Sequence, residues 1–207
     1  ATVRAVAQGR KPHRVAFAGT LATLVYALRV RPWLLAWGAT EDEPQKSLPG
    51  DELVSDPGNE STRAVTIEAP VEEVWPWLAQ IGQDRGGFYS YEWLENLAGC
   101  RMRNADRIHP EWQERDVGET VFLHPANGLK VALFEPKRVL ALKGWGAFVL
   151  EPLDERRTRL IARGRGQPGL ASVVYTLLLE IPHFIMERKM LLGIKERAER
   201  AAGTASA

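Results

Sequence analysis

Alternating hydrophobic and polar positions indicate a sheet in the middle of the chain. Residues 62–69, TRAVTIEA, alternate and are rich in β-branched side chains, as expected of a strand with one face on a core. Further on, short runs of the same kind are separated by turn residues such as Asn127-Gly128. Short strands joined by short turns predict an antiparallel meander, with strands over 119–124, 129–135, 138–144, 147–153 and 157–165.

Two short helices are predicted between the first strand and the meander. The first covers residues 70–82: Pro70 suits a first helical position, two acids follow in the first turn, and Gly82 ends it. Pro76 removes a backbone hydrogen bond inside this helix, so we expect a kink there. The second helix covers residues 89–99, YSYEWLENLAG.

The C-terminal part of the chain has a helical pattern from Leu170 to about Arg200, and Pro182 predicts either two pieces or one kinked helix. Because the predicted sheet has one apolar face, the long helix must cover it. We therefore predict an α+β fold in which a curved antiparallel sheet wraps around a long C-terminal helix. Two short helices follow the first strand, a hydrophobic helix stands at the N-terminus, and a cavity lies between sheet and helix.

The side chains of the last predicted strand support the prediction of a cavity. One face carries four arginines between Arg157 and Arg165, and the opposite face shrinks from Leu160 to Gly164. Small inward side chains leave space rather than fill it. We expect the arginine face to be solvated, and contact with anionic lipid headgroups is the alternative.

The N-terminal region, residues 1–40, predicts a basic start and a hydrophobic helix. Val15–Leu28 is uncharged, but it is shorter than the roughly 20 residues that span a bilayer. Trp33 and Trp37 suit a membrane interface. A membrane anchor, an interfacial helix and a helix packed on the domain all stay open. We expect membrane association through this helix, with a cytoplasmic location otherwise.

The remaining boundaries follow from composition. Residues 41–60 contain three prolines and many acids, which predicts a linker. Residues 61–201 are then the folded domain, and residues 202–207 a disordered tail. Charge is balanced at 27 basic and 26 acidic residues, so no global field indicates nucleic acid as a partner. The chain has one cysteine and no zinc, P-loop or dinucleotide motif, so we expect no metal and no cofactor.

Aromatic residues gather around the loop between the two short helices. Tyr89, Tyr91 and Trp93 have apolar bodies and polar tips, which suit a pocket rim, although burial in the core is an alternative. Arg85 is placed to meet a ligand carboxylate or phosphate, or else to pair with a nearby acid.

A second group of candidates lies on the C-terminal helix. His183 and Glu187 share a face, so they are our candidates for a catalytic acid/base pair. A structural role beside Pro182 is the alternative. His109 follows an acid but matches no metal-ligand spacing. The full set of predicted ligand-binding residues is Trp77, Arg85, Tyr89, Tyr91, Trp93, His109, Trp112, Trp145, His183, Met186 and Met190.

Several strings within residues 37–197, among them WGATEDE, VWPWLAQIGQDRGGFYSYEWLENLAGC, HPEWQ and HFIMERKMLLGIK, resemble an uncharacterised, mostly bacterial branch of the SRPBCC superfamily. This START-like, or helix-grip, superfamily includes polyketide cyclases/dehydrases and lipid-transfer proteins. The resemblance implies a hydrophobic cavity but no single reaction.

Two hypotheses for function follow. In the first, the protein binds a hydrophobic or amphipathic small molecule, lipid or polyketide-like, between sheet and helix. In the second, the same cavity belongs to a cofactor-independent cyclase, dehydratase or isomerase that uses His183 with Glu187.

Overall fold

The computed structural model describes residues 24–205 of the chain. The chain divides into two compact units, residues 1–34 and residues 35–207. The described part of the first unit is helical: the π-helical turn η1 (Tyr26–Val30) runs into α2 (Arg31–Leu35). Most of Val15–Leu28 lies outside the described residues, so its membrane role stays a prediction.

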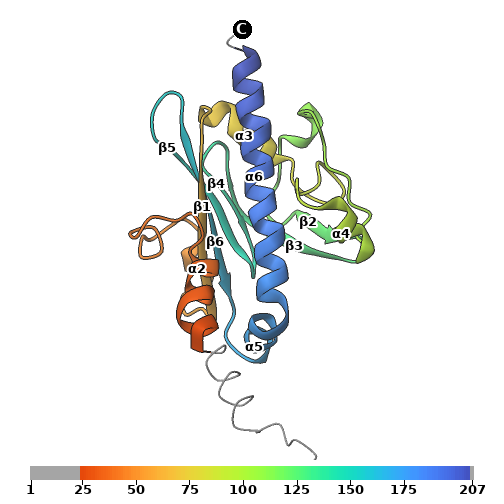
Figure 1. Ribbon diagram of the computed structural model, residues 1–207. Coiled ribbons are helices and arrows are strands. Elements are labelled where there is room, and N and C mark those ends of the chain that lie inside the picture. The colour runs from red at the N-terminus through yellow and green to blue at the C-terminus, as the bar shows by residue number, and fades with distance from the viewer. Residues whose placement is uncertain (1–23, 206–207) are drawn as a thin grey trace, which may run out of the picture. The chain divides into compact units, whose positions relative to one another are not determined.

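The second unit is built on a six-stranded antiparallel sheet (Figure 1). The first strand pairs with the last one along nine residues, and the other strands follow as a meander, which gives the order β1-β6-β5-β4-β3-β2. The predicted antiparallel sheet is confirmed. Its strands are β1 (Asn59–Ile67), β2 (Thr120–His124), β3 (Asn127–Glu135), β4 (Val139–Leu142), β5 (Gly146–Pro152) and β6 (Thr158–Gly166).

Two short α-helices lie between β1 and β2. Pro70 precedes α3 (Val71–Ala79), and Glu72 and Glu73 occupy its first turn, where they oppose the positive end of the helix dipole. The second is α4 (Glu92–Leu97). Short 3₁₀ turns are η2 (Asp51–Leu53), before β1, and η3 (Pro110–Trp112), between α4 and β2.

The C-terminal helix continues through Pro182 without a break between its helical segments. It consists of α5 (Leu170–Val174), the π-helical turn η4 (Tyr175–Leu179) and α6 (Glu180–Ala205). Pro182 has no N–H to donate to the preceding turn, and the wider π-helical turn η4 ends at Leu179, shortly before it. Figure 1 shows α6 lying across one face of the sheet.

The face of the sheet beneath α6, here the inner face, carries the main hydrophobic core. Leu191, Ile194 and Ala198 of α6 are fully buried against it, together with Leu160 of β6 and Ile67 of β1. The long helix is therefore held by burial along its C-terminal half.

The opposite, outer face of the sheet is also covered. Residues 39–56, which we call the strap, lie between α2 and β1, and their side chains and carbonyls contact the arginines of β6. Arg163 donates to the carbonyls of Pro44, Glu43 and Lys46, at 2.7–3.1 Å. It is only 2% exposed. The strap therefore carries contacts to the folded domain, although its composition predicted a linker.

The expectation of a solvated arginine face is wrong for this reason. Arg159 pairs with Glu43 of the strap at 2.7 Å, and Arg163 and Arg165 both pair with Glu60 of β1, at 2.6 and 3.0 Å. Acids from a distant part of the chain neutralise the ladder. A small apolar cluster lies beside it, in which Leu48 of the strap packs with Ala64, Val139, Ala141, Ala147, Val149 and Ile161.

Candidate functional site

An apolar cavity of about 420 Å³ lies on the inner face, between the sheet and the C-terminal helix. Ligand pockets typically fall between about 300 and 1,000 Å³, so its size suits a small molecule. Its walls come from the loops around α4, from β2 to β5, and from η4 and α6. The lining residues are Phe88, Ser90, Glu95, Met102, Leu123, Leu129, Leu142, Trp145, Phe148, Tyr175, Leu179, Pro182, His183, Met186, Glu187 and Met190.

A buried ion pair stands behind this cavity. Arg63 of β1 donates to Glu187 Oε2, and both side chains are almost completely inaccessible to solvent. The guanidinium also lies over the ring of Phe184, with its Cζ atom 5.3 Å from the ring centroid. A charged pair removed from water is stable only when both partners stay in place. Arg63 therefore fixes the Glu187 carboxylate at the cavity wall.

The second oxygen of this carboxylate is one of two unpartnered carboxylate oxygens in the lining. Glu187 Oε1, like Glu95 Oε2 of α4, is buried and has no hydrogen-bond partner among the described residues. Glu187 Oε1 lies 3.6 Å from His183 Nε2. A buried oxygen without a donor costs free energy, so each such atom calls for an explanation. Because Glu187 lines the cavity, a donor group on a bound molecule could supply the missing hydrogen bond.

His183 is held between two aromatic side chains. The indole N–H of Trp145 donates to His183 Nε2 at 3.3 Å, and Tyr175 Oη lies 2.5 Å from His183 Nδ1. Because an indole can only donate, Nε2 must accept, and the proton of the neutral ring sits on Nδ1. Burial lowers the pKa of His183, against the opposing effect of Glu187. The imidazole is therefore neutral near pH 7.

Two further titratable groups, Glu95 and Tyr175, line the cavity. Burial raises the pKa of Glu95 on α4 to about 7, and the nearby Glu92 carboxylate adds to the shift. Burial also raises the pKa of the Tyr175 hydroxyl to about 12. Near neutral pH, Glu187 is thus the one acid of the lining that an arginine keeps paired, while Glu95 takes up and releases protons.

A second hollow of about 280 Å³ adjoins the first. Trp145, Tyr175 and His183 line both, so this triplet forms a shared wall. The other walls of the second hollow are more polar and include Asn59, Glu60, Ser61 and Gln167, together with Gly144, Gly164 and Gly166. Gly164, from the face predicted to leave space, therefore borders a hollow.

The structure places five of the predicted residues in the cavity lining. These are Trp145, His183, Met186, Glu187 and Met190. Their roles in binding or catalysis stay predictions.

Tyr89 and Trp77 are not at a pocket rim. Tyr89 is 1% exposed, and its hydroxyl donates to the Trp77 carbonyl at 3.0 Å. The two rings meet edge to face, with centroids 5.8 Å apart. A side chain at Gly193 of α6 would collide with the Tyr89 carbonyl, so the helix approaches Tyr89 closely. Both aromatic residues belong to the core because α6 packs directly on them.

Arg85, His109 and Trp112 lie together, but at a different place. They line a polar depression with Arg103 and Arg107. Arg85 pairs with Glu119 at 2.8 Å and donates to the carbonyls of Trp112 and Glu114, so its charge is already matched within the fold. His109 stacks on Trp112 with ring centroids 4.0 Å apart. Among the described residues no cluster of three or more His, Cys, Asp or Glu side chains suits a metal ion.

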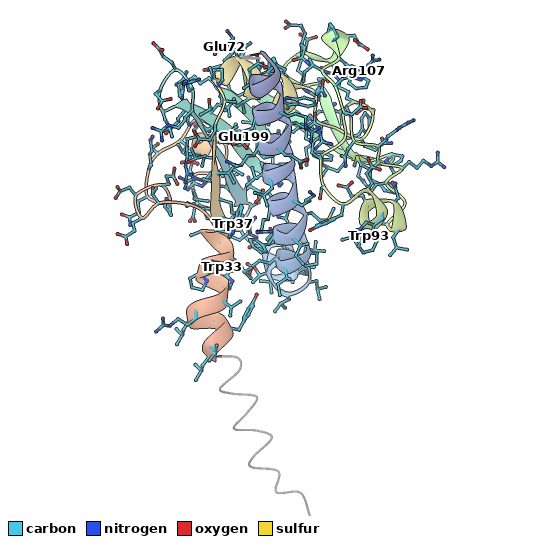
Figure 2. All side chains as sticks on the ribbon, turned by 45° about the horizontal axis from the view of Figure 1, so that its top comes forward. Trp33, Trp37, Glu72, Trp93, Arg107 and Glu199 are labelled. Atoms are coloured by element: carbon cyan, nitrogen blue, oxygen red, sulfur yellow. The ribbon has the colours of Figure 1, made fainter. Side chains whose placement is uncertain are left out.

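Tyr91 and Trp93 complete the predicted set, and neither lines the cavity. Lys189 Nζ lies 6.0 Å from the centroid of the Tyr91 ring. Trp93 is 69% exposed on α4, and Figure 2 shows it at the edge of the molecule.

Sequence reasoning missed several residues that define the site. The alternation of β1 places Arg63 on the same face as Val65 and Ile67. An arginine on an apolar strand face predicts a buried partner of opposite charge, so the sequence could have indicated this pair. Tyr175 and Glu95 carried no comparable signal. Tyr175 lies within an apolar helical run, and Glu95 looks like any surface acid of a short helix.

The class defined by this architecture is an α+β protein with a six-stranded antiparallel sheet and a long C-terminal helix, which matches a helix-grip fold. The chain matches no family model and no curated protein.

Several solved structures are similar to the chain. A Polyketide_cyc-like protein from Corynebacterium glutamicum has 19% identity over 71% of this chain and 91% of its own, with a TM-score of 0.33. A protein from Arthrobacter aurescens has 15% identity over 69% and 87%, with a TM-score of 0.41. A conserved protein of unknown function from Enterococcus faecalis has 12% identity over 72% and 73%, with a TM-score of 0.37. Likenesses at these scores carry no argument about function.

Proposed function

We propose that the protein binds an amphipathic small molecule in the inner-face cavity. Its apolar body would lie against the lining, and a hydroxyl or N–H group would donate to Glu187 Oε1. The buried, unpartnered Glu187 Oε1 at the wall of a mainly apolar cavity carries this proposal. A lipid-like or polyketide-like molecule has this combination of a large apolar surface and few polar groups.

Each part of the cavity supports this ligand class. Met186, Met190 and Met102 contribute flexible side chains that adapt to irregular apolar shapes. Arg63 forms a buried ion pair with this carboxylate, and a hydrogen bond to a charged acceptor is stronger than one between neutral groups. A ligand with a hydrogen-bond donor should therefore bind better than a pure hydrocarbon of the same size.

The test compares two tryptophan substitutions on β3. Leu129 lines the cavity, whereas Leu133 packs on the outer-face cluster of the same sheet. Leu129→Trp would fill the cavity, and Leu133→Trp is the matched control. We would measure binding of phenylnaphthylamine, a fluorescent apolar probe with one N–H donor, to the full chain.

Leu129→Trp should weaken probe binding at least tenfold, while Leu133→Trp should leave it within about twofold. Equal binding by both variants would refute the proposed cavity. Native mass spectrometry of the full chain, purified from a lipid-containing host, would then identify any resident ligand by its mass. That ligand should be absent from the Leu129→Trp variant.

The second candidate function is proton-transfer catalysis in the same cavity. The observation that favours it is the close approach of His183 Nε2 and Glu187 Oε1, two acceptor atoms at one wall. Against it, both ring nitrogens already have aromatic partners, so a ligand proton would have to displace the Trp145 indole.

Mass spectrometry also separates these two candidates. An enzyme with its base disabled, as in Glu187→Gln, would accumulate a bound molecule of different mass from that in the wild type. A binding protein would keep the same molecule at lower occupancy. The melting temperature of the variant serves as the control for folding.

A further inference from the structure

One side of the C-terminal helix is apolar and open to solvent over its first half. Leu170 is 79% exposed and Leu177 is 75% exposed, values that are unusual for leucine in a folded domain. The exposed residues are separated by one, three or four positions, so they share one side of the helix. This apolar stripe consists of Leu170, Val173, Val174, Leu177, Leu178, Ile181 and Ile185.

The other side of the same segment is packed. Ser172, Glu180 and Phe184 are all at most 7% exposed. The two acids between Gly166 and Arg188 are Glu180 and Glu187, and both are buried, so no exposed charge interrupts the stripe. The helix is therefore held firmly with its apolar side outward, and an exposed patch of this length marks an interaction surface.

The full helix, residues 170–203, is the one described helix whose length and composition would allow it to cross a membrane. Its packing excludes that role in this fold, because Leu191, Ile194 and Ala198 form part of the core. A helix that is fixed to a sheet by its C-terminal half can still lay its exposed side on a bilayer.

We propose that the apolar stripe docks on the surface of an anionic phospholipid bilayer. The proposal goes beyond ligand binding, and two contacts connect it to the cavity. Leu179 of η4 and Leu123 of β2 both line the cavity, yet they are 52% and 39% exposed. The cavity thus opens beside the stripe, where an apolar molecule could pass between lipid and protein without crossing water.

Charge around the opening fits an anionic surface. Met102 lines the cavity, and its two neighbours in sequence, Arg101 and Arg103, are both exposed. Trp93 and Leu97 on α4 are 69% and 80% exposed, and indole side chains favour the membrane interface. Basic residues near a bilayer surface gain about 1 kcal/mol each from anionic lipids.

The described part of the N-terminal unit also exposes large apolar side chains. Its Leu24, Leu28 and Trp33 are 51–69% exposed. Exposed leucine and tryptophan side chains of this kind suit a membrane interface.

The test places a fluorophore directly on the stripe of the full chain. In a Cys100→Ser background, which removes the only cysteine, Leu178→Cys would carry nitrobenzoxadiazole. Leu153→Cys is the matched control, because Leu153 is a 50% exposed leucine in the turn between β5 and β6. The vesicles would be phosphatidylcholine with about 30 mol % phosphatidylglycerol, with and without doxyl-labelled lipid that quenches a fluorophore in contact with the acyl chains.

The probe at position 178 should be quenched several-fold, and the probe at position 153 should be unaffected. The same contrast should hold if the N-terminal segment alone already brings the chain to vesicles, because the readout reports the local environment. An unquenched probe at 178 on vesicle-bound protein would overturn the proposal. So would a stable dimer in solution that Leu177→Ser with Leu178→Ser dissociates, since a second copy would then cover the stripe.

A second measurement tests the stripe without a fluorophore. Leu177→Ser with Leu178→Ser should lower the partition of the full chain onto these vesicles about tenfold or more. Phenylnaphthylamine binding without vesicles should stay unchanged, which separates failure of docking from failure of the proposed cavity. Unchanged partition in this double variant would also count against the proposal.

Discussion

The two faces of the sheet differ in the partners that their buried charged side chains have. On the outer face, Arg159, Arg163 and Arg165 are matched by strap and β1 acids and by backbone carbonyls. On the inner face, Arg63 and Glu187 form a buried pair, and one carboxylate oxygen has no partner among the described residues. The outer face is closed by the strap, whereas the inner face keeps a cavity of about 420 Å³.

This difference separates structural charge from charge available to a ligand. On the outer face, Arg163 Nε and Asp51 Oδ1 are buried without a hydrogen-bond partner among the described residues, but they lie 3.8 Å from each other, so their opposite charges offset within the fold. On the inner face, an unpartnered carboxylate oxygen belongs to a residue that lines an apolar hollow, where a ligand could donate to it. The number of arginines on β6 is therefore a poor guide to function, while one oxygen on α6 is a better guide.

The largest expected effect comes from breaking the inner-face pair. Arg63→Met leaves the Glu187 carboxylate buried without its cation, so the free energy of unfolding should fall by about 3–5 kcal/mol. Urea denaturation measures this change. The double variant Arg63→Met with Glu187→Leu should recover most of the loss, because no unpaired charge remains. A loss below about 1 kcal/mol in the single variant would show that the pair is not coupled.

A smaller loss is expected on the outer face. Arg163→Met removes the hydrogen bonds to three strap carbonyls, but Glu60 keeps its contact with Arg165. We expect a loss of about 2–3 kcal/mol in the free energy of unfolding and faster hydrogen exchange in the strap. Phenylnaphthylamine binding should not change. Weaker probe binding would mean that the two faces are coupled through the sheet.

The shared wall between the two hollows should respond to Trp145→Phe. Removing the indole N–H frees the lone pair of His183 Nε2, which can then hold a proton towards Glu187 Oε1 at 3.6 Å. The pKa of His183, which burial lowers, should therefore rise. Titration of the imidazole by NMR measures the shift, and the expected loss of stability is about 1 kcal/mol. An unchanged or lower pKa would contradict the deduced tautomer.

The smallest effect concerns Glu95. Its pKa of about 7 in the fold lies above the usual 4.5, so the folded state binds the proton more tightly than the unfolded state does. The stability from this group is fully present below pH 4.5 and is lost as the pH rises through about 7. Because the side chain is partly exposed, the difference should be only about 1 kcal/mol. Glu95→Gln should abolish this part of the pH dependence in urea titrations, and an unchanged profile would assign it to another group.

Much of the architecture could be predicted because it depends on local pattern. The alternation in β1 and β6 places Val65, Leu160 and Ala162 on the inner face, and the structure has them there. The spacing of His183 and Glu187 by four residues brought both to one helix side, and both line the cavity. Burial in the aromatic loop could not be predicted in the same way. Tyr89 and Trp93 are both large aromatic residues of one short segment, yet they are 1% and 69% exposed. Whether a neighbouring helix covers an aromatic side chain is decided by packing.

The sequence alone determined the antiparallel sheet, the long apolar helix and the face on which each side chain stands, because periodicity follows from backbone geometry. Only the tertiary structure decided which groups are partners. Arg63 meets Glu187 across 124 positions, and Arg163 meets the carbonyl of Pro44 across 119. Local pattern cannot encode such pairings, because they depend on which chain segment packs over each face. That packing neutralised the arginines of β6 and left Glu187 Oε1 buried without a hydrogen-bond partner among the described residues.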